Sequence, residues 1–370
     1  MVARVTQLTP YKRIVVKVGS ALLVQDGALR RSWLTRLCGD ISVLQSNGTE
    51  VIIVSSGAIA LGCEALKMNR SELSLAQKQA CAAVGQSILT RAYDDALAAF
   101  GHRSAQALLT LDDTEDRRRW LNARATLSTL LNLNVVPVVN ENDTVATQEI
   151  RYGDNDRLAA RTAQMIGADL LILLSDVDGL YTSDPRQSDT AEHIDDVSVI
   201  DETILAMGGD ANADSGVGSG GMATKLLAAK ICMSAGCDMI ICDGTKDGAL
   251  GLLGTGARHT IFRAASDPKG ARAQWIAGSL APSGTLLIDT GAETALRSGR
   301  SLLAAGLSSI SGHFSKGDTV GIRMSDGREI ARGLSSYDSQ DLAPICGLRS
   351  ENITHPAGPV VVHRDNLVML

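Results

Sequence analysis

The chain of 370 residues is poor in aromatic side chains, has no long apolar run and carries no large charge of either sign. Phe, Trp and Tyr make up 3% of the residues, so the core must be built from Val, Ile, Leu and Ala. Such a core suits buried parallel strands and helices better than a β-sandwich. No run approaches the roughly 18 apolar residues of a membrane span, and the N-terminal MVARVTQLTPYKR lacks the apolar stretch of a signal peptide. We therefore expect a cytoplasmic protein that does not enter a membrane.

Charge and cysteine content exclude further classes of protein. A formal net charge of −6 gives no electrostatic reason to expect nucleic acid or an anionic membrane as the main partner. The 7 cysteines form no CxxC pair, and the spacing of Cys232, Cys237 and Cys242 fits neither a zinc site nor a disulfide framework. We expect reduced, mostly buried thiols. The length allows two domains.

The first part of the chain alternates short β-branched runs with segments of helical period. The predicted strands are RIVVKVGS (13–20), EVIIVSSGA (50–58), NVVPVVNEND (134–143), DLLILLSDVDG (169–179) and DMIICDG (238–244). The predicted helices span 32–45, 75–100, 112–133, 156–166 and 222–235. Because the strands are apolar on both faces, this alternation predicts an open, mainly parallel α/β sheet between two helical layers.

Polar residues follow four of the predicted strands, and the texture of the sequence changes near its C-terminal end. Ligands of open parallel sheets bind beyond the carboxyl ends of the strands, which makes 17–20, 55–57, 140–143 and 175–176 candidate site segments. After Phe262 we expect a linker (263–280) and then an all-β module (281–370). That module has a hairpin turn at Asp326 and Gly327, and residues 359–370 are predicted to form its last strand.

The segment GVGSGGMATK (216–225) is rich in glycine and ends in a lysine. It matches neither the Walker A pattern nor the Rossmann fingerprint, which would follow a strand directly. Glycines at 216, 218, 220 and 221 nevertheless let backbone N–H groups approach an anion, and a helix from Met222 adds its N-terminal partial charge, with Lys225 in its first turn. The alternative is a flexible surface loop with a solvated lysine.

A second lysine, Lys17, lies inside the apolar run VVKVGS. Because an unpaired buried ammonium group is costly, Lys17 either faces an anion or extends from the strand end to solvent. Two glycine-flanked lysines on separate segments suggest cations that converge on a transferring phosphoryl group.

Taken in order, the motifs resemble the glutamate 5-kinase family of the amino acid kinase superfamily. The resemblance rests on VVKVGS (15–20), VSSGAIALG (54–62), KQACAAVGQ (78–86), VVPVVNENDTVAT (135–147), GDND (153–156), LLSDVDGLYTSDPR (173–186) and GSGGMATK (218–225). It implies a three-layer αβα sandwich over 1–262, the linker, and a small PUA-like β-barrel over 281–370. It also implies phosphorylation of the γ-carboxylate of L-glutamate by ATP, the first step of proline biosynthesis.

The resemblance carries residue roles with it. Glutamate is expected at Ser56, Asp143 and Asn155. ATP is expected at Lys17, Ser175, Asp176, Ser219, Gly220, Gly221, Met222, Ala223, Thr224 and Lys225. Mg²⁺ is expected on the ATP phosphates, with no metal ligand from the protein. Proline is an expected feedback inhibitor, the chain an expected homo-oligomer, and glutamate-5-semialdehyde dehydrogenase an expected transient partner.

The expected chemistry is compatible with this set of residues. A carboxylate is already ionised at neutral pH, so no general base is needed, and Lys17 and Lys225 serve to offset the repulsion between two anions. Asp154 of GDND is our candidate for the group that holds both lysines, whereas Asn155 and Asp143 are expected to bind the α-amino end of the substrate. The alternative for GDND is an Asx turn with helix capping by Asp156.

Three weaker alternatives remain open on the sequence. The charge-dense run 112–127 reads as a solvated helix with pairs Asp113–Arg117 and Glu115–Arg119, or as an anion site or subunit contact. PUA-like modules can bind RNA, although residues 278–370 contain 8 basic and 9 acidic side chains, which disfavours an RNA backbone. Aspartate or N-acetylglutamate could replace glutamate as the acceptor.

Overall fold

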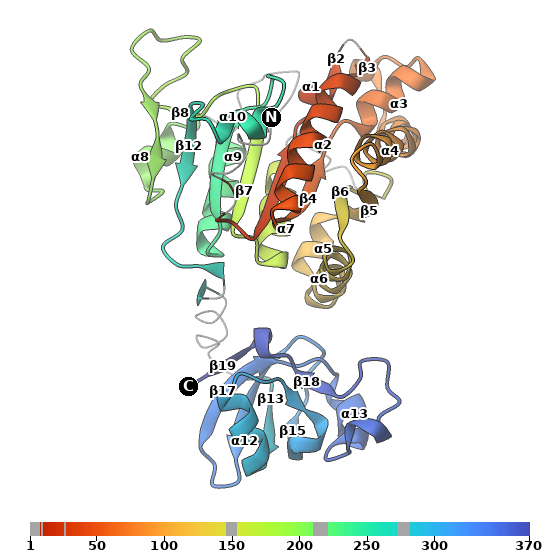
Figure 1. The fold of residues 1–370 in the computed structure, drawn as a ribbon, viewed down its shortest axis with the longest axis vertical. Coiled ribbons are helices and arrows are strands. Elements are labelled where there is room, and N and C mark those ends of the chain that lie inside the picture. Colours follow the sequence, from red (N-terminus) through yellow and green to blue (C-terminus); the bar gives the residue numbers. More distant parts are fainter. Residues whose placement is uncertain are drawn as a thin grey trace. The chain divides into compact units, whose positions relative to one another are not determined.

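The structure, a computed structural model, describes residues 8, 10–25, 27–145, 154–209, 221–268, 270–271 and 282–370. The chain divides into two compact units, Met1–Pro268 and Lys269–Leu370 (Figure 1). The division falls inside the segment predicted as a linker. Each unit has its own buried apolar core, and each is described by itself below.

The first unit is built on an eight-stranded sheet in the order β10-β12-β11-β7-β1-β4-β6-β5 (Figure 1). Among the described strand pairs of this sheet, β11–β12 is antiparallel and the others run parallel. The predicted mainly parallel sheet is thus confirmed. The strands are β1 (Arg13–Val18), β4 (Glu50–Ser55), β5 (Arg103–Leu109), β6 (Val135–Glu141), β7 (Leu170–Ser175), β10 (Asp196–Val197), β11 (Asp238–Asp243) and β12 (His259–Phe262). Two short pairs, β2 (Val24–Gln25) with β3 (Ala28–Leu29) and β8 (Leu180–Tyr181) with β9 (His193–Ile194), lie outside it.

Helices cover both faces of the sheet because successive strand residues point to opposite sides. In β1, Ile14, Val16 and Val18 belong to the core that contains α2, α4 and α10, whereas Val15 belongs to the core of α6, α7 and α9. This gives the predicted αβα layers. The helices are α1 (Ser20–Leu23), α2 (Arg31–Ser46), α3 (Ala58–Leu66), α4 (Leu75–Ala98), α5 (Leu111–Glu115), α6 (Arg117–Asn132), α7 (Asp154–Ile166), α8 (Glu202–Ala206), α9 (Met222–Ser234) and α10 (Ala249–Leu253).

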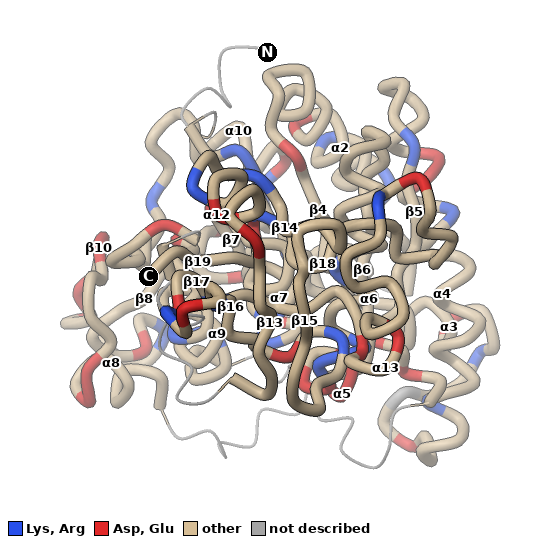
Figure 2. Tube along the Cα trace, turned by 90° about the horizontal axis from the view of Figure 1, so that it is seen from below, with Lys and Arg blue, Asp and Glu red and all other residues tan. Residues whose placement is uncertain are grey.

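The predicted helix 112–133 is interrupted at Asp116. Thr110 and Asp113 form a capping box that starts α5, and the Asp116 carboxylate then caps α6 by accepting a 2.8 Å hydrogen bond from the backbone N–H of Arg119. The predicted side-chain pairs are therefore wrong. Arg119 pairs with Asp113 at 3.2 Å instead, and Glu115 pairs with Arg157 of α7 at 2.8 Å. Acidic and basic segments accordingly lie side by side at α5 in Figure 2.

The second unit contains a five-stranded sheet in the order β15-β13-β16-β17-β19. The predicted hairpin turn joins β16 to β17, and Gly327 has the positive φ of 88° that favours glycine. Residues 359–370 form two short strands in different sheets rather than one. The elements are β13 (Gly284–Ile288), α12 (Thr290–Arg297), β14 (Leu302–Leu303), β15 (Leu307–Gly312), β16 (Thr319–Met324), β17 (Glu329–Leu334), α13 (Ser339–Leu342), β18 (Val360–Val362) and β19 (Leu367–Met369).

Two further findings concern the cysteines and membranes. All seven cysteines are free thiols and six are buried, as the sequence predicts. Among the helices that the structure describes, none is both long enough and apolar enough to cross a membrane.

Candidate active site

The carboxyl ends of the central strands lie level with one another. Val18 at the end of β1 is in register with Ser55 of β4 and Leu174 of β7, and Val54 is in register with Val139 of β6. The polar residues that follow these strands consequently gather at one edge of the sheet, where parallel sheets bind their ligands. The predicted location of the site is supported by this register.

Two buried lysines meet one buried carboxylate at this edge. The Nζ atom of Lys17 lies 2.5 Å from Oδ1 of Asp156, and that of Lys225 lies 3.1 Å from Oδ2. The Asp156 side chain is 0% exposed, and those of Lys17 and Lys225 are 11% and 7% exposed. The hydroxyl group of Thr224 lies 3.3 Å from the same Oδ2 atom and 2.8 Å from a second acceptor, the carbonyl oxygen of Gly221. These three ionised side chains have a formal charge of +1 together.

Strand and helix periodicity bring these three residues together. Lys17 shares the face of β1 with Val15, and this face is covered by α7 and α9. Asp156 lies in the first turn of α7, and Lys225 lies in the first turn of α9 after the N-cap Gly221. Three elements that are distant in the sequence therefore deliver one charge each to the same point.

The pKa of Asp156 reflects this arrangement. Burial alone would raise the pKa, but the attraction of Lys17 and Lys225 outweighs burial and lowers it to about 2. Asp156 is therefore ionised at any physiological pH, and it keeps both ammonium groups at the strand ends.

The residue that bridges the lysines differs from the one predicted. We expected Asp154 in this role, and Asp156 entered only as a helix cap in the alternative interpretation of GDND; the carboxylate found between the two lysines is that of Asp156. Asp154 opens α7, but its side chain lies outside the described residues.

The sequence contained a signal for Asp156. Ala159, Ala160 and Ala163 follow it at helical spacings of three, four and seven, and all are 0% exposed. The buried face of α7 therefore begins at Asp156. A carboxylate on a buried face needs a cation, and Lys17 and Lys225 were already candidates.

Next to the lysines lies a neutral hydrogen-bonded group centred on Asn155. Its Nδ2 atom donates to Oγ of Ser56 at 2.5 Å, to the carbonyl oxygen of Ser55 at 3.2 Å and to Oδ1 of Asn140 at 3.3 Å. Its Oδ1 atom is buried and has no hydrogen-bond partner among the described residues. The predicted substrate residues Ser56 and Asn155 are thus in contact, and Asn140, which was part of a predicted strand tail only, joins them.

Asp143 is the third residue predicted for the substrate. It follows β6 by two residues and is half-buried, and burial raises the pKa of its carboxyl group to about 6. No hydrogen bond or ion pair joins Asp143 to another described residue. It is a carboxylate with little compensation for its lost hydration, in contrast with Asp156.

Besides Lys17 on β1, the predicted ATP-binding residues lie on two segments, one at the end of β7 and one at the start of α9. Ser175 is buried and donates a 3.1 Å hydrogen bond to the exposed Asp176. Gly221, Met222, Ala223 and Thr224 form the N-terminus of α9, as predicted. Ser219 and Gly220 lie outside the described residues.

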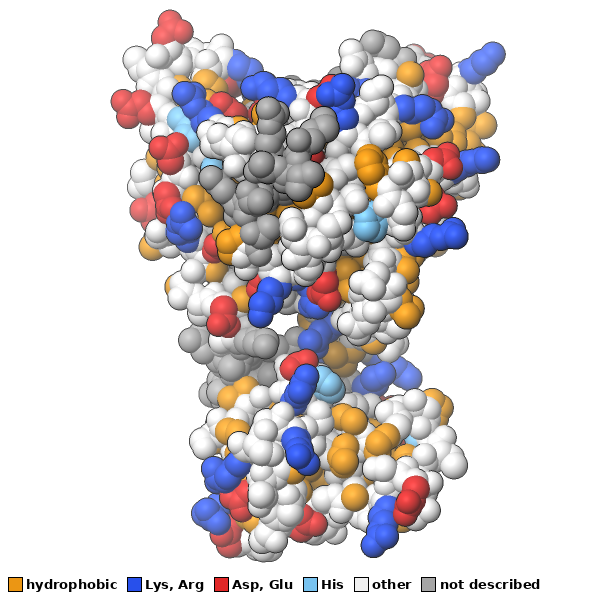
Figure 3. Space-filling view, in the orientation of Figure 1, with side chains coloured by type: hydrophobic (Ala, Val, Ile, Leu, Met, Phe, Trp, Pro, Cys, Tyr) orange, Lys and Arg blue, Asp and Glu red, His pale blue; other side chains and the backbone are white. Residues whose placement is uncertain are grey.

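Two further observations concern surface charge and possible metal ligands. On the face shown in Figure 3, charged side chains of both signs are visible over the second unit. Within the described part of the chain, no group of His, Cys, Asp and Glu has the makeup of a metal site.

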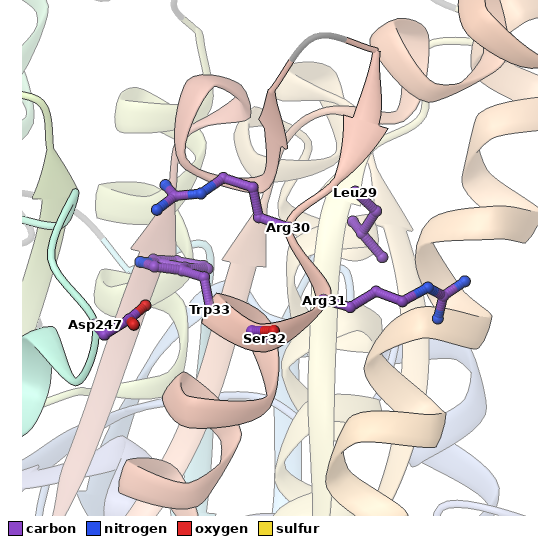
Figure 4. Close-up of a pocket in the computed structure, with 6 residues that line it drawn as sticks. All are labelled: Leu29, Arg30, Arg31, Ser32, Trp33 and Asp247. Carbon is purple, nitrogen blue, oxygen red and sulfur yellow. The ribbon is translucent and has the colours of Figure 1, made fainter.

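An open pocket of about 410 Å³ lies in the first unit, between the start of α2 and the loop after β11 (Figure 4). The guanidinium group of Arg30 lies 5.7 Å from the Trp33 ring, and the indole N–H donates to the carbonyl oxygen of Gly244 at 2.9 Å. None of the predicted site residues is among those that line it, which are Leu29, Arg30, Arg31, Ser32, Trp33 and Asp247.

The chain matches the models of two known protein families. The model of the amino acid kinase family matches residues 12–243, which carry all the site residues described above, and that of the PUA domain matches residues 284–357. The chain belongs to the amino acid kinase family.

Curated relatives match over nearly the whole chain. A protein of Caulobacter vibrioides named glutamate 5-kinase is 53% identical over 97% of this chain and 96% of its own. Glutamate 5-kinase 1 of Rhizobium meliloti is 52% identical over 98% of this chain and 93% of its own. The glutamate 5-kinase of Brucella anthropi is 52% identical over 98% and 97%.

Proposed function

We propose that the protein transfers the γ-phosphoryl group of ATP to the γ-carboxylate of L-glutamate, giving L-glutamyl 5-phosphate and ADP, the first step of proline biosynthesis. The observation that carries this proposal is the Lys17–Asp156–Lys225 cluster beside the Ser56–Asn155 contact. The names of the relatives specify the acceptor.

The two lysines stabilise the negative charge of the transferring phosphoryl group. Both reactants are anions, and the transferring phosphoryl group spreads negative charge over its equatorial oxygens. Ammonium groups already held in place by Asp156 stabilise that charge without reorganising during the reaction. The acceptor carboxylate is ionised at neutral pH, so no residue has to remove a proton from it.

The acceptor is held on the neutral side of the site. Ser56 and Asn155 supply hydrogen-bonding groups for the substrate, including Oδ1 of Asn155, which has no partner among the described residues and accepts from a donor such as an ammonium group. Asp143 supplies a negative charge for the same α-amino group. A free amino group thus fits better than an acetylated one.

ATP is assigned to Ser175, Asp176 and the N-terminus of α9. The backbone N–H groups and partial positive charge of that terminus favour phosphate. Mg²⁺ arrives with ATP as part of the substrate and neutralises phosphate charge. On the resemblance alone, we further propose inhibition by proline, assembly into a homo-oligomer and transient contact with glutamate-5-semialdehyde dehydrogenase.

The test is ADP release with Mg·ATP and, in parallel, L-glutamate, L-aspartate or N-acetyl-L-glutamate, with hydroxylamine to trap an acyl phosphate. We expect ADP and hydroxamate in equal amounts with glutamate only. Activity with another acid would overturn the substrate but keep the reaction. No turnover with any acid would contradict the proposal, and binding of structured RNA at low salt would then be measured.

A further inference from the structure

A buried tyrosine reaches the back of the substrate side of the site. Tyr93 of α4 is 0% exposed, and its hydroxyl oxygen lies 3.0 Å from Oγ of Ser55, also 0% exposed, at the end of β4. Ser55 is the residue before Ser56. Neither the reaction nor the substrate requires a phenol at this point.

The direction of this hydrogen bond follows from the bonds of Ser55. The Ser55 hydroxyl group donates its single hydrogen to the carbonyl oxygen of Ser56 at 3.2 Å. Both hydrogen bonds are made at once when Ser55 Oγ accepts and the Tyr93 hydroxyl group donates. Burial raises the pKa of Tyr93, so its hydrogen is retained at neutral pH.

The chain of bonds ends on the Ser56–Gly57 peptide, and the preceding peptide, between Ser55 and Ser56, is held as well. The N–H group of Ser56 donates to the carbonyl oxygen of Val18 at 3.1 Å, and the carbonyl oxygen of Ser55 accepts from Asn155 at 3.2 Å. Tyr93 thus completes the set of contacts that orients Ser56 toward Asn155.

Helix α4, which carries Tyr93, packs tightly against helix α3. A Cβ atom on Gly85 of α4 would lie 1.7 Å from the carbonyl oxygen of Ala58, the first residue of α3, and one on Gly62 of α3 would lie 1.8 Å from that of Cys81. The backbones of the two helices therefore touch directly. Because α3 begins two residues after Ser56, α4 fixes both the side-chain contact and the start of the following helix.

We propose that Tyr93 is a positioning residue for the acceptor: through Ser55 it sets the orientation of Ser56, and it affects acceptor binding without touching the acceptor. The inference rests on the assignment of Ser56 to the substrate in the proposed function. It predicts an effect on the acceptor and none on ATP.

The experiment compares Tyr93→Phe with Tyr337→Phe in the full chain. Tyr337 is also buried, 1% exposed, and its hydroxyl group donates to the carbonyl oxygen of Gly358 within the second unit, so its variant controls for loss of a buried hydroxyl group. We expect Tyr93→Phe to raise KM for glutamate about fivefold, the effect of one hydrogen bond, with KM for ATP unchanged. We expect Tyr337→Phe to alter Tm only.

A double-mutant cycle with Ser55→Ala tests the route. If Tyr93 acts through Ser55, the two changes in KM for glutamate do not add in the double variant. Additive changes, equal changes in KM for glutamate and ATP, or an unchanged KM for glutamate would overturn the inference. Glutamate-dependent turnover by the unmodified chain is measured first, so a failure of the proposed function is seen there and not in the variants.

Discussion

The two sides of the site differ in whether a cation of the protein compensates the buried carboxylate. On the phosphate side, Asp156 is fully buried but bridges Lys17 and Lys225, and its pKa is lowered to about 2. On the acceptor side, Asp143 is half-buried, and its pKa is raised to about 6 by burial. The buried carboxylate of the phosphate side is thus compensated by the protein itself, whereas the described residues of the acceptor side leave a charge and an amide oxygen that a ligand can satisfy.

The largest effect is expected when the Asp156 carboxylate, which bridges the two lysines, is removed. Asp156→Asn leaves two ammonium groups close together without their shared carboxylate, so we expect turnover to fall by about 10²-fold or more. Glu329→Gln is the matched control, because Glu329 lies between Arg323 at 3.1 Å and Arg332 at 2.6 Å in the second unit. Circular dichroism establishes that both variants fold, and ADP release then measures turnover. Comparable losses in the two variants would refute a specific role for Asp156.

The next largest effect is expected when either lysine is removed. Lys17→Ala and Lys225→Ala each remove a group that stabilises charge in the transition state, and we expect each to lower kcat by about 10²-fold or more. The measurement is steady-state ADP release by the purified, folded variants. Near-normal turnover in either one would exclude that lysine from the reaction.

The contribution of Asp143 to binding of the acceptor is tested by varying the pH. Asp143 attracts the substrate ammonium group only when ionised, and it becomes protonated as pH falls through about 6. We expect KM for glutamate to rise about tenfold between pH 7 and 5, and Asp143→Asn to have a high KM that no longer varies over this range. A pH dependence that survives in the variant would mean that another group titrates.

The same variant is expected to be more stable than the parent. A raised carboxyl pKa means that ionisation disfavours the folded state, so Asp143 costs stability above pH 6 and costs none below about pH 4. Asp143→Asn should therefore raise stability at pH 8 by about 1 kcal/mol and leave it unchanged at pH 4. Thermal unfolding at the two pH values measures this difference. A loss of stability at pH 8 would show that the carboxylate has a favourable partner in the folded protein.

The smallest effect is expected at an exposed ion pair on the same helix as Asp156. Arg157 pairs with Glu115 at 2.8 Å, but the two side chains are 43% and 53% exposed. Arg157→Ala should change stability by less than about 1 kcal/mol and leave KM for glutamate unchanged. Urea unfolding and steady-state kinetics check this prediction; a large kinetic effect would extend the site beyond the buried face of α7.

The fold was predictable from the sequence where one pattern acts alone. The runs around Lys17, Ser55 and Ser175 are apolar on both faces, as is typical of strands in a parallel sheet covered on both sides. The break at Asp116 was missed because a capping carboxylate competes with helical propensity, and the sequence does not show which one prevails. Helix α12 in the second unit was missed because residues 281–370 were predicted to be all-β, although Asp289 caps the helix there.

The site was predictable in its composition but less so in its pairing. Lys17, Lys225, Ser56 and Asn155 could be found from strand tails, the glycine-rich segment and the resemblance. The choice between Asp154 and Asp156 depends on which face of α7 is buried, a three-dimensional property. Tyr93 is 38 residues from Ser55 in the sequence, and no local pattern marks a contact between them.

The most direct test follows the oxygen atoms of the acceptor. With Mg·ATP, hydroxylamine and L-glutamate labelled with ¹⁸O in its γ-carboxylate, carboxylate attack on the γ-phosphorus leaves one labelled oxygen in the phosphate that hydroxylamine releases. We predict phosphate that contains one ¹⁸O atom for each ADP formed. Unlabelled phosphate would mean that water, not the carboxylate, accepts the phosphoryl group, and it would contradict the account.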